Sequence, residues 1–320
     1  MKPAIAVVGS LNMDFVVTTD HLPAPGETVL GRDFRMNPGG KGANQACAAG
    51  RLSPPQLRTY MIGRVGYDMF ADHLKASLAA AGVDVSAVHA TKSAPTGVAL
   101  IWVDAEGQNS IVVAAGANLL LTKSEVEPMR PVFRQCGLAL FQLETPVSTV
   151  QAALGAAREE GARTILDPAP ARRLPEGMLE AVDLLTPNET EACILLGRPA
   201  GRVGLEEAPE LAAELRSAGV GEVVLKLGDL GCYYSGPDGA YHVPGFAVEA
   251  RDSTAAGDTF NGALAVALAE GKPMEEALRF ANAAAAISVT RPGAQASVPT
   301  RQEVEEFLGA RPGGEERPSG

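Results

Sequence analysis

The sequence has few cysteines, and they are not spaced as disulfide partners or metal ligands usually are. Cys47, Cys136, Cys193 and Cys232 are scattered, each among apolar or small residues. None forms the close pair that is typical of a structural zinc site. We therefore expect reduced, buried thiols in a cytoplasmic protein.

Positive charge is also scarce. The 320 residues include 27 Lys and Arg against 38 Asp and Glu, a formal net charge of −11. This composition argues against nucleic acid as the main partner, because binding it requires a basic face. An acidic protein that handles phosphate groups must gather a few Lys or Arg residues, or a metal ion, at one place.

Long apolar runs are absent as well. The first apolar segment, Ala4 to Val8, ends at Gly9 and is too short for the core of a signal peptide, so we interpret it as a buried strand. No other run approaches the length that crosses a membrane. We expect no association with a membrane.

Strand and helix patterns alternate through the second half of the chain. Strand-like runs at Leu138 to Phe141, Thr164 to Asp167 and Asp183 to Thr186 are separated by helical or turn segments. Repeated βαβ order predicts an α/β fold with a doubly wound, mostly parallel sheet that helices cover on both faces.

Three further strand-like runs lie outside this alternation. Thr96 to Val103 and Ser110 to Ala114 form a hairpin pattern, and Thr28 to Met36 is a third surface strand. They predict a small sheet that acts as a lid. We expect one catalytic domain over residues 1–309, with lid strands near 14–36 and 96–114, and a disordered tail over 310–320, which is rich in Gly, Pro and charge.

The most informative stretch is Asp252 to Gly262. Its small residues, Ala255 to Gly257, lead toward a run that we interpret as a helix from Ala263 to Glu270. A helix start exposes unpaired N–H groups and a partial positive charge, which favour an anion such as phosphate. Asp258 would repel a bound phosphate, so it is a candidate general base beside an anion hole. The alternative interpretation, that Asp258 merely caps a helix packed in the core, remains open.

Polar residues also follow the predicted strands. Asn12 and Asp14 come just after the first strand, where ligands of open α/β sheets bind, and they offer an amide and a carboxylate to vicinal hydroxyls. An Asx turn is the alternative. Glu144, Asp167 and Asn188 also stand at or after strand ends.

A glycine-rich stretch, Asn37 to Asn44, is the second candidate for close approach to a ligand. Its three glycines permit φ > 0, and Lys41 and Asn44 could reach a ligand from the first turn of the helix that follows. The Walker A spacing is absent. The alternative, that this stretch is a turn with a purely structural role, remains open.

Taken together, three spaced motifs resemble the ribokinase branch of the PfkB family of sugar kinases. They are Gly39 to Ala46, Thr186 to Glu191, and Asp252 to Gly262. The resemblance runs from the first strand to Pro299. The ribokinase branch is indicated by shorter matches at Asn12 to Asp14, Pro168 to Arg172, Pro244 to Phe246, and Gly293 to Ser297.

The resemblance implies ATP-dependent phosphorylation of D-ribose to D-ribose 5-phosphate. Asp258 would deprotonate the primary hydroxyl of the sugar, while N–H groups of Ala255, Ala256 and Gly257 hold the γ-phosphate. The residues implied to bind the sugar are Asn12, Asp14, Gly40, Lys41, Asn44, Glu144 and Asp258.

The same resemblance implies a nucleotide site and two kinds of cation. The residues implied for ATP and its phosphates are Asn188, Lys226, Gly228, Asp229, Gly231, Gly257 and Asn282. Many ribokinases have Thr where this chain has Lys226, and Ser or Glu at Asp229, and the resemblance implies that nucleotide contact there is largely through the backbone. Glu191 would help to organise Mg²⁺. A K⁺ ion would be bound by the Asp252 side chain, by carbonyls of Thr254, Ser288, Arg291 and Gly293, and by the Ser297 hydroxyl. An all-oxygen set suits a hard cation.

Several alternatives stay open. Within the family, the substrate could be another sugar or a nucleoside, such as fructose, 2-keto-3-deoxygluconate or adenosine. A sugar-binding protein without catalysis would not need Asp258, and a hydrolase is disfavoured because no His lies near a motif. The lid runs, including Ile101 to Val103 and Ile111 to Val113, are too apolar to stand alone in water, which predicts a homodimer through the lid.

Overall fold

The computed structural model describes residues 2–311, so most of the predicted tail, from residue 312 on, lies outside the described residues. The main sheet has nine strands in the order β13-β12-β11-β10-β9-β8-β1-β4-β5. Its strands are β1 (Ala4–Val8), β4 (Arg58–Gly66), β5 (Val83–Thr91), β8 (Leu138–Phe141), β9 (Arg163–Leu166), β10 (Leu184–Leu185), β11 (Glu222–Lys226), β12 (Gly231–Gly236) and β13 (Gly239–Pro244). All neighbours pair in parallel except β11–β12 and β12–β13, which confirms the predicted mostly parallel sheet.

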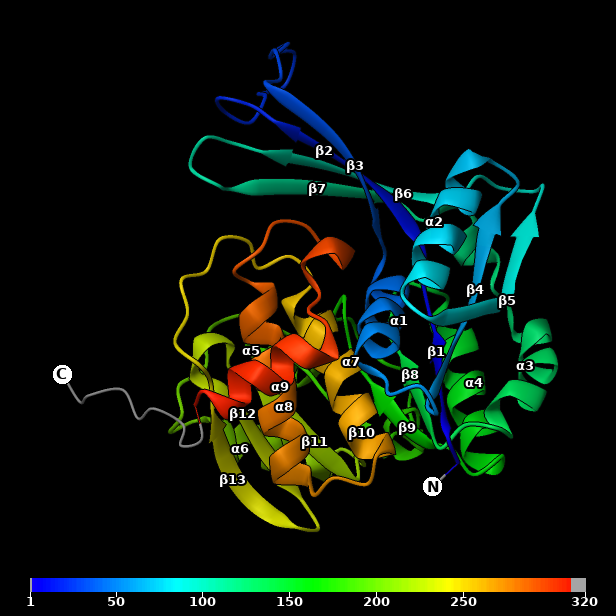
Figure 1. Cartoon of the computed structure of the whole chain (residues 1–320), viewed down its shortest axis with the longest axis vertical. Helices are drawn as coiled ribbons and strands as arrows, with labels where there is room; N and C mark the ends of the chain where they lie inside the picture. The colour runs from blue at the N-terminus through cyan, green and yellow to red at the C-terminus, as the bar shows by residue number, and fades with distance from the viewer. Residues whose placement is uncertain (1, 312–320) are drawn as a thin grey trace.

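Helices cover both faces of this sheet (Figure 1). One face packs against α1 (Lys41–Leu52), α2 (Met69–Ala80), α7 (Ala256–Ala269), α8 (Met274–Ser288) and α9 (Arg301–Gly309). The other packs against α3 (Val126–Phe133), α4 (Val147–Glu159), α5 (Glu189–Leu195) and α6 (Ala208–Ser217). Strand β1 serves both cores, because Ile5 and Val7 point into the first and Ala6 and Val8 into the second.

A second, four-stranded sheet projects beyond the α/β body (Figure 1). Its order is β3-β2-β6-β7, with β2 (Asn12–Thr18), β3 (Asp33–Gly39), β6 (Gly97–Val103) and β7 (Asn109–Ala114). The small separate sheet is therefore confirmed, but one of its boundaries was predicted wrongly: the strand predicted from Thr28 to Met36 instead starts at Asp33 and runs through Pro38 to Gly39. Asn12 and Asp14 lie at the start of strand β2, which rules out the alternative of an Asx turn. Pro38 is compatible with a strand here because β3 is an edge strand.

Other boundaries differ for identifiable reasons. Strand β5 was not predicted, because only Val83, Val88 and Thr91 of its residues are buried and they do not alternate with polar ones. Strand β4 continues past Ile62 to Gly66. Helix α6 begins at Ala208 rather than Leu205, and α7 begins at Ala256 rather than Ala263, so the small residues of the motif belong to the helix itself.

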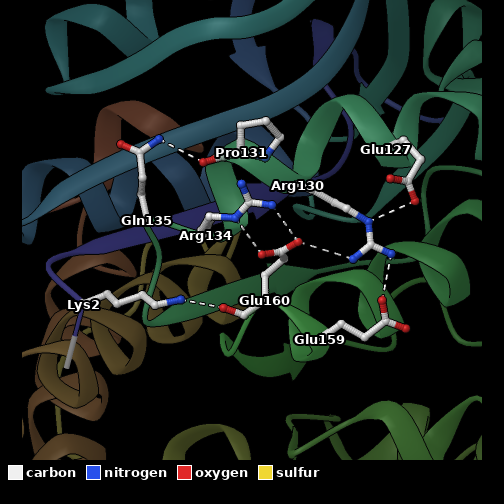
Figure 2. Close-up of polar contacts among 8 residues, drawn as sticks. All are labelled: Lys2, Glu127, Arg130, Pro131, Arg134, Gln135, Glu159 and Glu160. Atoms are coloured by element: carbon white, nitrogen blue, oxygen red, sulfur yellow. Dashed lines mark hydrogen bonds and ion pairs between the residues drawn. The ribbon is translucent and has the colours of Figure 1, made fainter.

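Helix α3 was also missed, because prolines at 128 and 131 argue against a helix. Pro128 lies in the first turn, where its missing N–H has no partner to lose. Figure 2 shows how α3 is tied to α4: Arg130 contacts Glu127 and Glu159, and both Arg130 and Arg134 contact Glu160. The pair with Glu127 lies within α3, whereas the pairs with Glu159 and Glu160 bridge the two helices. Lys2 also donates a hydrogen bond to the Glu160 carbonyl (Figure 2).

Two further expectations can be checked here. All four cysteines are buried and free, and burial raises the pKa of the Cys47 thiol to about 11, which makes it unreactive. Within residues 2–311, none of the helices combines the length and apolar character needed to span a membrane.

Candidate active site

The polar residues of the motifs converge at the carboxyl ends of the central parallel strands. Asn12 and Asp14 enter from β2, which follows β1, and Glu144 follows β8. Asp167 follows β9, and Lys226 ends β11. Ligands of open α/β sheets bind at this edge.

The start of helix α7 forms one wall. Its N-cap, Ala255, has φ 58°, a left-handed conformation that is rare for a residue with a Cβ, and no side chain caps the helix. The Ala256 N–H donates to the Ser253 carbonyl (3.2 Å). The first hydrogen bond that spans a full helical turn runs from the Thr259 N–H to the Ala255 carbonyl. The Ala256 N–H is thus engaged with the preceding loop, and the N–H groups that follow it, those of Gly257 and Asp258, are the ones left at the start of the helix as candidates to bind an anion.

Asp258 lies in this first turn but does not cap the helix, so the capping alternative is wrong. The side chain is 5 % exposed, and its two oxygens accept bonds from Asn44 Nδ2 (3.1 Å) and Gln45 Nε2 (3.0 Å). Burial raises its pKa to about 6, although Lys41 and the two amide bonds oppose this shift. Asp258 is therefore mostly ionised at neutral pH and close to the pKa that favours a general base.

Helix α1 and the residue before it supply three of the predicted sugar ligands, Gly40, Lys41 and Asn44, of which Asn44 bonds Asp258. Gly40 precedes the helix with φ 90°, and a Cβ there would stand 2.7 Å from the Asn12 nitrogen, so only glycine fits. Lys41 begins the helix, and its N–H bonds Glu144 (3.1 Å). Burial opposes the charge of Lys41, but carboxylates including Asp258 raise its pKa and keep it protonated.

Three of the predicted sugar ligands are buried polar side chains. Asn12, Asp14 and Asn44 are each no more than 9 % exposed. The buried Asn44 Oδ1 has no hydrogen-bond partner within residues 2–311, which suits it to accept a hydroxyl of a ligand. Burial and the nearby Glu144 and Asp258 raise the pKa of Asp14 to about 7. This arrangement supplies both donors and acceptors to a polyhydroxylated molecule.

The predicted nucleotide residues are spread more widely. Lys226 Nζ bonds Asp167 (2.9 Å) and lies 3.3 Å from where a Cβ on Gly257 would stand, so the ammonium adjoins the start of α7. Asn188 and Glu191 form a capping box at the start of α5. Gly228 and Gly231 flank an exposed turn with φ 59° and 94°, and Asp229 lies within it. The Asn282 amide donates to the carbonyls of Val243 and Pro244, which ties α8 to β13.

The residues predicted to hold K⁺ form a junction of two loops. Asp252 accepts from the Thr254 N–H (2.9 Å) and the Gly293 N–H (2.8 Å). Burial would raise the pKa of Asp252, but these bonds outweigh it and hold the pKa below its usual range. Ser297 and Ser288 donate their hydroxyls to nearby carbonyls, and the Arg291 guanidinium pairs with Glu303. Among residues 2–311, no three His, Cys, Asp or Glu side chains are placed to hold a metal, so a cation here would need main-chain and hydroxyl oxygens in addition to the Asp252 carboxylate.

Two residues of the site were not assigned from the sequence. Gln45 is fully buried and bonds both Asp258 and Asp167, and Asp167 in turn pairs with Lys226. Gln45 belongs to the first glycine motif and Asp167 was noted at a strand end. Neither pattern indicates which carboxylate the amide would reach.

The comparisons with known proteins agree with this geometry. Residues 2–301 match the family described as pfkB family carbohydrate kinase. A Bacillus subtilis protein named ribokinase is 43% identical over 95% of this chain and 99% of its own length. Its Haemophilus influenzae counterpart, also named ribokinase, is 41% identical over 96% and 99%. A solved structure of Arabidopsis thaliana ribokinase complexed with ribose and ATP is 35% identical, with a TM-score of 0.87 over 96% of this chain and 99% of that one.

Proposed function

Because the chain belongs to the pfkB family of carbohydrate kinases, we propose that it transfers the γ-phosphoryl group of ATP to the 5-hydroxyl of D-ribose. The observation that carries the proposal is Asp258, a buried carboxylate that stands at the start of α7 and beside the polar cluster of α1 and β2. A base next to an anion hole is what phosphoryl transfer to an alcohol requires.

The sugar is held by the buried polar cluster. Asn12, Asp14, Asn44 and Glu144, with the Gly40 backbone and Lys41, bind its hydroxyls and aim the 5-hydroxyl at Asp258. Positioning of this kind is a large part of catalysis, because it converts a bimolecular encounter into a reaction within one complex.

Asp258 takes the proton of the 5-hydroxyl as the sugar oxygen bonds to the γ-phosphorus. The bond from that phosphorus to the β–γ bridging oxygen breaks, and ADP leaves with both electrons of the bond. The N–H groups at the start of α7, together with the Lys226 ammonium beside Gly257, stabilise the charge on the transferred group. The lid excludes water, which would otherwise accept the phosphoryl group.

The ATP is held at the exposed turn of Gly228, Asp229 and Gly231 and beside Asn282. Asn188 and Glu191 would lie on the phosphate side, where Glu191 would help to hold Mg²⁺. When bound, Mg²⁺ neutralises charge on the phosphate oxygens.

K⁺ fits the junction of Asp252 with the loop of Gly293 and Ser297. Asp252 is held ionised there, and the carbonyls of Thr254, Ser288, Arg291 and Gly293 and the Ser297 hydroxyl supply oxygens. A cation at this point fixes the loop that leads into α7. Turnover measured in K⁺, Na⁺ and Cs⁺ at equal ionic strength is expected to be highest in K⁺ for the wild type and insensitive to the ion for Asp252→Ala. Equal rates for the wild type in all three salts would remove the ion from the mechanism.

The lid is also the surface through which we propose that two copies of the chain form a homodimer. Its strands leave Phe34, Ile111 and Val112 more than half exposed, an apolar surface that a partner lid would cover. The buried free thiols support a cytoplasmic location.

A substrate panel with MgATP tests the central proposal. D-ribose, 2-deoxy-D-ribose, D-fructose, 2-keto-3-deoxygluconate and adenosine are compared by kcat/KM, with the product identified by NMR. We expect D-ribose to have the highest value and to yield the 5-phosphate. Ready turnover of another member, with no ester formed from ribose, would reject the ribose assignment and leave the kinase family intact.

A further inference from the structure

Gln45 connects two carboxylates through a single amide group. Its Nε2 donates to Asp258 Oδ1 (3.0 Å) and to Asp167 Oδ2 (2.8 Å), and its Oε1 accepts from Gln142 Nε2 (2.7 Å). The side chain is fully buried. Ionised carboxylates can only accept hydrogen bonds, so the amide nitrogen of Gln45 must face the two Asp side chains. This orientation leaves its oxygen to accept from the third neighbour, Gln142.

Asp167 is anchored on its other side. Its Oδ1 accepts from Lys226 Nζ (2.9 Å), and the two side chains are 3% and 12% exposed. Asp167 follows β9 and Lys226 ends β11, with β10 between these strands, so the ion pair spans the carboxyl edge of the sheet. A buried charge pair of this kind holds its geometry because either partner alone would be left uncompensated.

We propose that Gln45 is a positioning residue for Asp258, and that the buried Asp167–Lys226 ion pair anchors it. The proposal rests on the role of Asp258 as the base that accepts the sugar proton. Asn44 holds one oxygen of Asp258 and Gln45 holds the other, so together they fix the plane of the carboxylate. Gln45 also separates Asp258 from Asp167 with a shared N–H donor group, and Lys226 offsets the charge of Asp167.

The charged groups around Asp258 determine whether a given substitution raises or lowers its pKa. Lys41 on α1 favours the ionised form of Asp258, whereas Asp167 after β9 disfavours it, and Asp14 on β2 is a further carboxyl neighbour. Removing the charge of Asp167 should therefore lower the pKa of Asp258. Removing Lys226 leaves Asp167 uncompensated and should raise it.

The first test is Gln45→Met, which keeps the length of the side chain but has no N–H donor. We expect kcat to fall by about 10- to 100-fold, as a slight misplacement of a reacting group does, while sugar affinity by calorimetry changes by less than about threefold. The acid limb of kcat/KM against pH should move up by about half a unit or more, because the ionised base loses a donor. In Gln45→Met/Asp167→Asn the limb should move back toward the wild type.

The second test uses the ion pair, with a matched control on the same strands. Asp167→Asn should move the acid limb down and Lys226→Met should move it up. Arg163 and Glu222 form a part-buried pair at the opposite ends of β9 and β11, so Arg163→Met and Glu222→Gln should leave the limb unchanged. Shifts in the same direction for Asp167→Asn and Lys226→Met, or none in either, would overturn the proposal.

The outcomes also separate this inference from the proposed function. Near-normal turnover in Asp258→Asn would reject the base itself. An inactive Asp258→Asn combined with an unshifted pH profile in Gln45→Met would reject only the positioning role. Circular dichroism identifies variants that do not fold, and if Gln45→Met is one of them, the near-isosteric Asp167→Asn decides the question.

Discussion

At the scale of single residues, Asp258 is the one whose replacement should separate chemistry from binding. We expect Asp258→Asn to lower kcat by about two to four orders of magnitude, the usual cost of losing a general base. The amide keeps the size of the side chain, so sugar affinity should stay within a few-fold of the wild type. Turnover and calorimetry on the same preparation provide the measurement, and a variant with near-normal turnover would remove Asp258 from the mechanism.

Asp14 links the site to the stability of the ligand-free fold. Its pKa is raised from 3.8 to about 7, so between these values the unfolded chain ionises while the folded chain stays neutral. Stability is therefore lost as the pH rises through this window, and the full cost, on the order of 4 kcal/mol, applies above it.

Asp14→Asn removes this cost. We expect the variant to be more stable than the wild type, and the gain in the free energy of unfolding to be larger at about pH 8.5 than at about pH 5.5. Urea unfolding at both pH values measures it. A gain that is equal at the two pH values, or larger at the lower one, would show that Asp14 is not the group that titrates.

The residues of the site were predictable to different degrees. Asp258, Lys41 and Asn44 stand in short motifs whose local sequence carries the signal. Gln45 and Asp167 were not predicted as partners, because their contact depends on β9, α1 and α7 meeting in space. The pKa values of Asp14 and Asp258 depend on burial and on charges from several elements, which no local pattern contains.

At the scale of elements, the contact between α1 and α7 places Asn44 and Gln45 against Asp258. Gly262 on α7 makes this contact possible: a Cβ there would stand 2.5 Å from Ala48 Cβ and 2.8 Å from the Ala49 nitrogen. The two helix backbones therefore touch, and a side chain at this position would separate them.

We expect Gly262→Ala to lower both stability and kcat. Overpacking typically costs about 1–3 kcal/mol, and the wider spacing would draw the two amides away from the base. Gly155→Ala on α4 is the matched control, because a Cβ there meets nothing within 4 Å. It should raise stability by about 0.5–1 kcal/mol, as alanine does in a helix, and leave kcat unchanged. Thermal unfolding and turnover of both variants test this, and a Gly262→Ala protein with wild-type kcat would show that the spacing is not critical.

The elements themselves were predicted best where the apolar pattern is clear. Strands β1 and β8 are short apolar runs that are buried throughout, and helix α4 buries residues at helical spacing. The start of strand β2 and the first turns of α7 were not recognised as regular structure, because polar and small residues occupy them. These departures from local preference lie at the site itself.

At the scale of the whole molecule, the lid is the part that leaves a strand of apolar residues exposed. Strand β7 is an edge strand and is exposed along its full length, with Ile111 53%, Val112 56% and Val113 48% exposed. An exposed apolar edge of this kind favours pairing with another chain. Since β2 of the same sheet carries Asn12 and Asp14, an ordered lid would also support the proposed sugar site.

We expect the protein to be a homodimer at micromolar concentration, with the two lids in contact. Ile111 and Val113 lie on one side of β7, so Ile111→Lys/Val113→Lys places two charges on one face of the strand and should give a monomer. Leu205→Lys is the control, because Leu205 is exposed to 40% but lies outside the lid. Light scattering measures the mass of all three proteins. Either a monomeric wild type or a double variant that remains dimeric would rule out the lid as the interface, and a monomer that retains full sugar affinity would show that one lid alone orders Asn12 and Asp14.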